Sequence, residues 1–134
     1  MILNALILSL TLTAADTDTK LDGTWQMQRL VGRGKEIDDD RARAISYVFE
    51  GNSAKRFVNG VDRKDPGTIK IDATKKPAHI DLKPAKEGDP MMLGVYEIDG
   101  DNLKWCFSSK KRPEKFEAPE GSDNILMIFK RVKK

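Results

Sequence analysis

The sequence predicts an all-β protein in which eight antiparallel strands, joined in sequence order, close into an up-and-down barrel with one short helical turn. Short segments of alternating apolar and polar residues, typical of half-buried strands, recur along the chain. Turn-forming Gly, Asp, Asn and Pro separate them by short connections, so neighbouring segments are expected to pair. Closure removes the exposed edges of an open sheet, although a two-sheet sandwich has the same periodicity.

The expected elements follow one another closely from residue 21 to residue 131. A capped helical turn is expected at 38–44, because its three leading aspartates favour the positive end of a helix dipole and the EF-hand calcium pattern is absent. A brief strand is expected at 35–37 and a charged loop at 59–67. The eight barrel strands are expected at residues 21–31, 45–50, 55–58, 67–72, 78–83, 94–98, 103–107 and 125–131.

The clearest hairpin spans residues 94–107. Its two strands flank Asp99-Gly100, a dipeptide that tolerates the positive φ of a tight β-turn. Apolar residues alternate on both sides of that turn, at Tyr96, Ile98, Leu103, Trp105 and Phe107.

The first and last strands differ in pattern. On the first, Trp25, Met27, Arg29 and Val31 are expected to share one face. The last strand, 125–131, is apolar at five consecutive positions, so we expect both of its faces to be covered. The long connection before it, 108–124, would be held in place by Phe116.

The N-terminal segment has the features of a secretory signal peptide. Residues 1–15 contain no charged side chain, and their apolar run is too short to span a bilayer and ends in small residues. We therefore expect a signal peptide at 1–15, a polar linker at 16–20 and a barrel domain at 21–134, in a protein exported to the periplasm, envelope or medium without a stable membrane span after cleavage. The alternative is a buried N-terminal strand or helix.

Composition argues against several classes of protein. The net charge is +3, and the Lys and Arg residues are mixed with Asp and Glu along the chain, so nucleic-acid binding is not expected. A single cysteine, Cys106, excludes an intramolecular disulfide and a zinc site built on several thiolates. A catalytic thiol would need His79, the one histidine, beside it, and nothing local supports that pair. We expect Cys106 to be a small core residue.

Aromatic and methionine side chains on the strands are the candidates for a ligand cavity or for a filled core. Aromatic residues make up only 7% of the chain, which argues against a large hydrophobic cavity. The candidate set is Tyr47, Phe49, Tyr96, Trp105, Phe107, Met127 and Phe129.

A small polar cluster is expected on the segment 78–83. His79 and Asp81 share one face there, and with Lys70 and Asp72 they offer a metal site or an acid–base pair. The favoured interpretation is an outward polar face, because the alternating apolar residues occupy the other face and zinc needs further nitrogen or sulfur ligands.

The connection 108–124 has two interpretations. Arg112-Pro113 and Phe116 could belong to a lid over the barrel mouth. The favoured interpretation is a rigid turn in which Arg112 pairs with a carboxylate such as Asp99 or Asp101.

The two ends of the chain predict one specific contact. The first strand opens with Gly23-Thr24-Trp25 and the last ends with Lys130-Arg131. These strands are neighbours in a closed barrel, so Arg131 is expected to lie over Trp25, within about 6 Å of the ring, and to seal the barrel floor. This combination resembles the lipocalin pattern.

A wider set of motifs carries a second resemblance. Residues 21–25, 67–72, 76–82, 94–103, 106–107 and 112–113 follow in that order. Together they resemble an uncharacterised exported domain family, found mainly in planctomycete bacteria and described as lipocalin-like, over nearly all of residues 21–131. The resemblance implies a small barrel behind a signal peptide. It implies no activity and no functional residues.

The expected function is that of a binding module. We expect an exported monomeric barrel that holds a small apolar ligand, and the alternative is a structural or protein-interaction domain of the cell envelope with a filled core. No phosphate-binding glycine loop and no G-x-S-x-G motif is present. An enzyme is therefore not expected, and the sequence predicts no catalytic, cofactor-binding or metal-binding residues.

Overall fold

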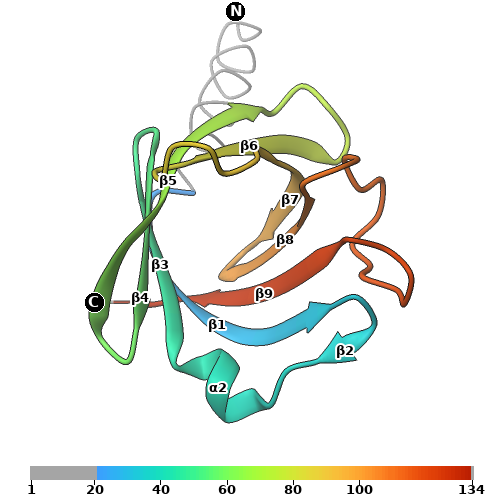
Figure 1. Ribbon diagram of the computed structural model, residues 1–134. Coiled ribbons are helices and arrows are strands. Elements are labelled where there is room, and N and C mark those ends of the chain that lie inside the picture. Colours follow the sequence, from blue (N-terminus) through green and yellow to red (C-terminus); the bar gives the residue numbers. More distant parts are fainter. Residues whose placement is uncertain (1–20, 134) are drawn as a thin grey trace, which may run out of the picture.

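Nine strands form one antiparallel sheet that closes on itself (Figure 1). The computed structural model describes residues 21–133. The sheet order is β2-β1-β3-β4-β5-β6-β7-β8-β9, and β1 also pairs with β9. The elements are β1 (Gly23–Gly32), β2 (Lys35–Glu36), α2 (Asp39–Arg43), β3 (Ile45–Glu50), β4 (Ser53–Val58), β5 (Val61–Asp72), β6 (Ala78–Pro84), β7 (Met92–Asp99), β8 (Asn102–Ser108) and β9 (Ile125–Arg131).

The predicted fold class is confirmed. Strand β2 is a two-residue extension on β1, and the other eight strands form the closed barrel. Among these eight strands, neighbours in sequence pair antiparallel, and the pairing of β1 with β9 excludes the two-sheet sandwich. No helix within residues 21–133 has the length and apolar character needed to cross a membrane.

Strand β1 changes face halfway along its length, which corrects one expectation. Its register against β9 shifts between Met27 and Arg29, so the side chains beyond the shift change sides. Leu30 consequently pairs with Met127 and packs against the inner cluster, whereas Val31 packs outside the barrel. The prediction that Arg29 and Val31 share the face of Trp25 was wrong, because an alternation read along one strand contains no sign of a bulge.

The predicted loop at 59–67 was also wrong. Residues Val61–Asp72 form one long strand, and β4 and β5 meet in a tight turn at Asn59-Gly60. Both turn residues have positive φ, 52° and 79°, as a two-residue hairpin with the twist of the strands requires. Pro66 inside β5 hid this strand from the sequence pattern, since proline cannot donate a ladder hydrogen bond. It lies opposite Lys55, next to a second register shift.

The helical turn is present as α2, although Asp38 makes no side-chain capping hydrogen bond. Asp39 and Asp40 occupy the first turn, where the helix dipole favours negative charge. Ala42 is fully buried in the inner cluster, so the helix is held by packing onto the barrel rather than by its cap.

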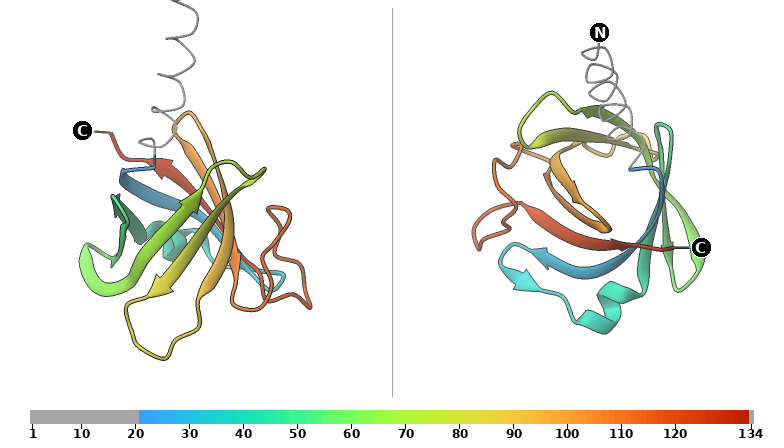
Figure 2. Two further views of the ribbon diagram at one scale, coloured as in Figure 1. Left: turned by 90° about the horizontal axis from the view of Figure 1, so that it is seen from above. Right: turned by 180° about the vertical axis from the view of Figure 1, so that it is seen from behind.

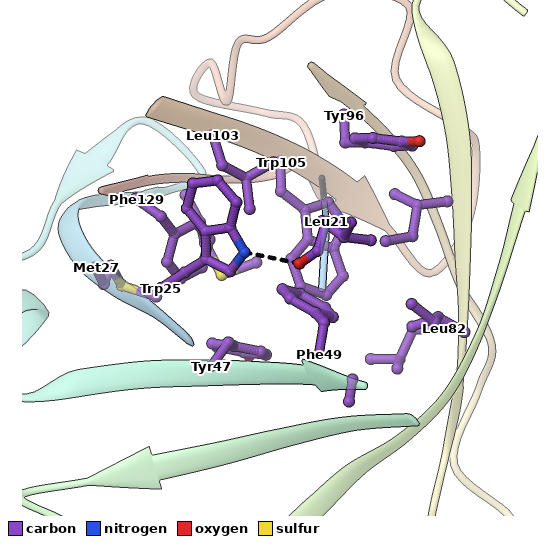
Figure 3. Close-up of a cluster of buried hydrophobic side chains, with 14 of the residues drawn as sticks. Leu21, Trp25, Met27, Tyr47, Phe49, Leu82, Tyr96, Leu103, Trp105 and Phe129 are labelled. Carbon is purple, nitrogen blue, oxygen red and sulfur yellow. Dashed lines mark hydrogen bonds between the residues drawn. The ribbon is translucent and has the colours of Figure 1, made fainter. Parts of the chain in front are cut away.

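The barrel interior is filled by an aromatic cluster around Trp105. The ring centroid of Trp105 lies 5.4 Å from that of Tyr47 and 5.6 Å from those of Phe49 and Phe107. Figure 3 shows the side chains of Tyr47, Phe49 and Trp105 converging from different strands. Edge-to-face and tilted contacts of this kind add to the area that the rings bury. All seven members of the predicted aromatic and methionine set belong to this inner cluster.

A second apolar cluster lies on the outer face of β7, β8 and β9. Val95, Cys106 and Leu126 form it, and Phe116 and Ala118 cover it from the connection between β8 and β9. Figure 2 shows that this connection runs outside the barrel wall. The expectations that both faces of β9 are covered and that Phe116 holds the loop are confirmed.

Candidate functional site at the barrel mouth

One end of the barrel is sealed by the first and last strands. Trp25 is fully buried, and its indole N–H donates to the Leu21 carbonyl at 2.9 Å (Figure 3). The Cζ of Arg131 lies 4.1 Å from the centroid of the Trp25 ring, inside the predicted limit. An Arg131 N–H also donates to the Asp22 carbonyl at 3.1 Å. The Arg131 guanidinium thus stacks on the Trp25 ring and links the end of β9 to the start of β1.

The opposite end of the barrel holds a pocket of about 410 Å³. Its lining residues come from β3 to β8 and from the connection between β6 and β7. The helix α2 does not line it and contacts β1 and β3 instead. Its apolar lining consists of Tyr47, Pro66, Leu82, Pro84, Pro90, Met92 and Phe107. Its charged lining consists of Arg56, Asp65, Lys86 and Asp89.

The apolar wall of the pocket continues directly into the barrel interior. Leu82 pairs with Met92 across β6 and β7, so their side chains share the inner face. Tyr47 and Phe107 flank the rim and contact the Trp105 ring below. The floor of the pocket is therefore the top of the aromatic cluster, and it is rigid because that cluster is closely packed.

An ion pair lies at the pocket wall. Arg56 pairs with Tyr47 across β3 and β4, so the two side chains share the inner face, at the register shift of β4. The Arg56 Nε and Nη2 donate to the two carboxylate oxygens of Asp65 at 3.1 and 2.8 Å. Both side chains remain partly exposed, at 37% and 40%. A charged bidentate pair consequently borders an apolar wall.

Tyr47 connects the apolar wall with the ion pair. Burial raises the pKa of Tyr47 to about 12, while the Arg56 charge opposes the rise and the Asp65 charge adds to it. The phenol is therefore a neutral hydrogen-bonding group at physiological pH.

Other hollows lie elsewhere on the surface of residues 21–133. One of about 500 Å³ is formed by the connection between β8 and β9 itself and is lined mainly by charged and polar residues. One of about 400 Å³ lies near the sealed end beside Tyr96, and one of about 320 Å³ lies beside α2. The mouth pocket differs from them in joining inner-face core residues to a charged pair.

The predicted cavity set divides between pocket and core. Tyr47 and Phe107 line the mouth pocket, and Tyr96 lines the hollow near the sealed end. The other members fill the core, namely Phe49, Trp105, Met127 and Phe129. Sequence reasoning missed Met92, Arg56 and Asp65 as pocket residues. The alternation of 78–83 did place Leu82 on the inner face, but no local signal places Arg56 there.

Arg112 has a different partner from the one predicted. Its Nη1 donates to Asp81 Oδ1 at 2.5 Å and to the Gly94 carbonyl at 2.8 Å, so it bridges the outer faces of β6 and β7. Asp101 pairs instead with Lys133 at 2.8 Å. Pairing with Asp99 or Asp101 was therefore wrong, because the connection folds sideways over the barrel wall. None of the residues that line the mouth pocket comes from 109–124.

The structure brings the predicted polar residues of β5 and β6 side by side, since Asp72 lies opposite His79 and Lys70 lies opposite Asp81, but Cys106 is not among them. His79 pairs with Val95 and Val95 with Cys106, so a strand separates the histidine from the thiol. Cys106 is fully buried, its Sγ lies 3.3 Å from the Glu117 carbonyl oxygen, and burial raises the pKa of the thiol. Among the residues that the structure describes, no group of three His, Cys, Asp or Glu side chains is placed to hold a metal ion.

Comparison with known proteins identified no matching family model, no matching curated protein and no matching solved structure.

Proposed function

We propose that this protein is a binding module that holds a small apolar molecule at the mouth of its barrel. The observation that carries the proposal is the pocket of about 410 Å³ with its inner wall of Leu82, Met92 and Phe107. Its volume lies within the range of about 300–1,000 Å³ that is typical of small-molecule sites. Such sites combine an apolar lining with a few placed polar groups, here Tyr47, Arg56 and Asp65.

The arrangement of the barrel suits this role. The sealed end and the aromatic cluster give the pocket a rigid base, so little ordering is needed when a ligand binds. Burial of a ligand's apolar surface against the wall contributes about 25 cal/mol per Å². The driving force is therefore hydrophobic, and the polar groups at the rim orient the ligand.

The test is binding of the neutral fluorescent dye Nile red to the protein, with native mass spectrometry of the freshly purified protein to detect a retained ligand. Met92→Trp places a large ring in the pocket and is expected to lower Nile red affinity at least tenfold. Met91→Trp is the matched control, because Met91 is 46% exposed and is not a lining residue. It should leave dye binding unchanged. Equal loss in both variants, or absence of dye binding by the wild type, would contradict the proposal.

The second candidate is a structural or protein-interaction domain of the cell envelope. The filled aromatic interior below the pocket favours it, because a dry core needs no ligand. This candidate predicts no retained ligand and no Nile red binding.

Export and family membership are part of the same proposal. The signal peptide at 1–15 and the linker at 16–20 lie outside the described residues, and their sequence alone supports them. The order in which the sequence motifs follow one another between residues 21 and 113 supports membership of the lipocalin-like planctomycete family. Mass spectrometry of the protein after expression with its leader should find the N-terminus near Asp16, and light scattering should give the mass of a monomer. An uncleaved chain in the exported fraction would contradict the signal peptide.

A further inference from the structure

We infer that the ligand of the mouth pocket is an uncharged amphiphile, with an apolar chain on the Leu82 and Met92 wall and a hydroxyl or amide head at the Arg56–Asp65 pair. This inference rests on the proposed function and adds the chemical class of the ligand. The juxtaposition of the pair with the apolar wall carries it.

The charged side chains that line the pocket carry no net charge. The pocket is lined by two cations, Arg56 and Lys86, and two anions, Asp65 and Asp89. A ligand carboxylate that approaches Arg56 also approaches the carboxylate of Asp65, and a ligand ammonium that approaches Asp65 also approaches Arg56. Each charged head therefore meets attraction and repulsion together, and it loses hydration on entering a partly apolar site.

Both partners of the Arg56–Asp65 pair can form further hydrogen bonds. The pair uses the Arg56 Nε–H and one N–H at Nη2, so the guanidinium retains further donors and the carboxylate retains further lone pairs. A hydroxyl or amide accepts from the arginine and donates to the aspartate at the same time. A carboxylate only accepts and an ammonium only donates, so each serves one side of the pair.

The apolar wall of the pocket sets the direction in which the ligand lies. The wall below the pair consists of Leu82, Met92 and Phe107, with the aromatic cluster beneath. A chain buried there leaves the head at the partly exposed ion pair. A single-chain amphiphile fits this arrangement because its polar head requires hydrogen bonding and its tail does not.

The experiment compares three probes with the same ten-carbon chain at neutral pH: 1-decanol, decanoate and decylammonium. The affinity of each probe for the wild-type protein is measured by its competition with Nile red. The expected result is that decanol binds about tenfold or more tightly than either charged probe. Tighter binding of decanoate or decylammonium would overturn the inference while leaving the proposed function intact, since a ligand is still bound. If neither Nile red nor any of the three probes binds, both the inference and the proposed function are contradicted.

Charge variants test whether the pair sets this preference. Asp65→Asn leaves Arg56 uncompensated and is expected to improve decanoate binding about tenfold, whereas Arg56→Gln should improve decylammonium binding by a similar factor. The matched control is Glu36→Gln, which breaks the Arg29–Glu36 pair, a bidentate pair at 2.9 and 3.0 Å outside the pocket. It should leave all three affinities unchanged. If one pocket variant fails to fold, the other carries the test, and unchanged selectivity in a folded pocket variant would overturn the inference.

Discussion

The indole nitrogen of Trp105 lies 3.0 Å from the position that a Cβ atom on Gly94 would occupy. The carbonyl oxygens of Ile80 and Cys106 lie at 2.9 and 3.0 Å from the same position. The absence of a side chain at Gly94 therefore leaves the space that the Trp105 indole occupies against the barrel wall. Within residues 21–133, the Trp105 Nε1–H is buried and has no hydrogen-bond partner.

Gly94→Ala is expected to destabilise the protein by about 1–3 kcal/mol, because the added methyl group meets backbone atoms on both sides and displaces the indole. Urea unfolding followed by tryptophan fluorescence measures the change. Gly32→Ala is the control, since the nearest atom to its added methyl lies 3.9 Å away, an ordinary contact. A loss in the control as large as that in Gly94→Ala would contradict the explanation.

Arg131→Gln is expected to cost about 0.5–2 kcal/mol of unfolding free energy, because it removes the cation from the face of Trp25. Lys130→Gln, at the exposed neighbouring position, should change stability much less. The comparison is made by thermal or urea unfolding. Equal losses of stability in the two variants would show that the contact of Arg131 with Trp25 contributes nothing beyond the effect of removing one positive charge.

Tyr47 predicts an alkaline loss of stability. Its pKa is raised from 10 to about 12 on folding, so the folded state favours the protonated phenol. The stabilisation is fully present below pH 10 and is lost as the pH rises to 12, amounting to about 2–3 kcal/mol. The difference in unfolding free energy between wild type and Tyr47→Phe should therefore change by that amount across this range. A difference that is independent of pH would contradict the burial of the phenol.

Arg112→Ala is expected to loosen the connection between β8 and β9. The variant removes the ion pair with Asp81, in which both side chains are only 25% exposed, and the hydrogen bond to Gly94. We expect faster amide hydrogen exchange in residues 108–124 and a loss of about 1–2 kcal/mol. Lys111→Ala, on the exposed neighbouring side chain, is the control. Unchanged exchange in Arg112→Ala would mean that Phe116 and Ala118 hold the loop alone.

Features that repeat locally were predictable from the sequence. The alternation of 78–83 predicts that Ile80 and Leu82 face inward, and both are buried. The apolar run of 125–131 predicts a strand covered on both faces, and the inner and outer clusters cover it. These predictions succeed because a strand's side chains alternate with period two whatever it pairs with.

Features that depend on register were not predictable. The bulge in β1 turns Arg29 outward, and the shift in β4 accompanies the ion pair of Arg56 with Asp65. Arg112 meets Asp81, 31 residues away, because the loop folds back over the wall. A one-residue shift changes the face of every side chain beyond it, and no local pattern encodes it.

The amino-acid sequence by itself thus determined the series of half-buried strands and the side chains that alternate along them, and it predicted the contact of the two terminal strands, whereas the pairing of β1 with β9 decided between a barrel and a sandwich. The tertiary structure alone decided where the interior is filled and where it is open. Strand periodicity specifies which side chains face inward, but the space left at the mouth depends on how side chains from distant strands share the barrel's cross-section. The same packing places Arg56 and Asp65 beside the wall of Leu82 and Met92. These residues form a candidate ligand site together, although no local sequence pattern marks them as one.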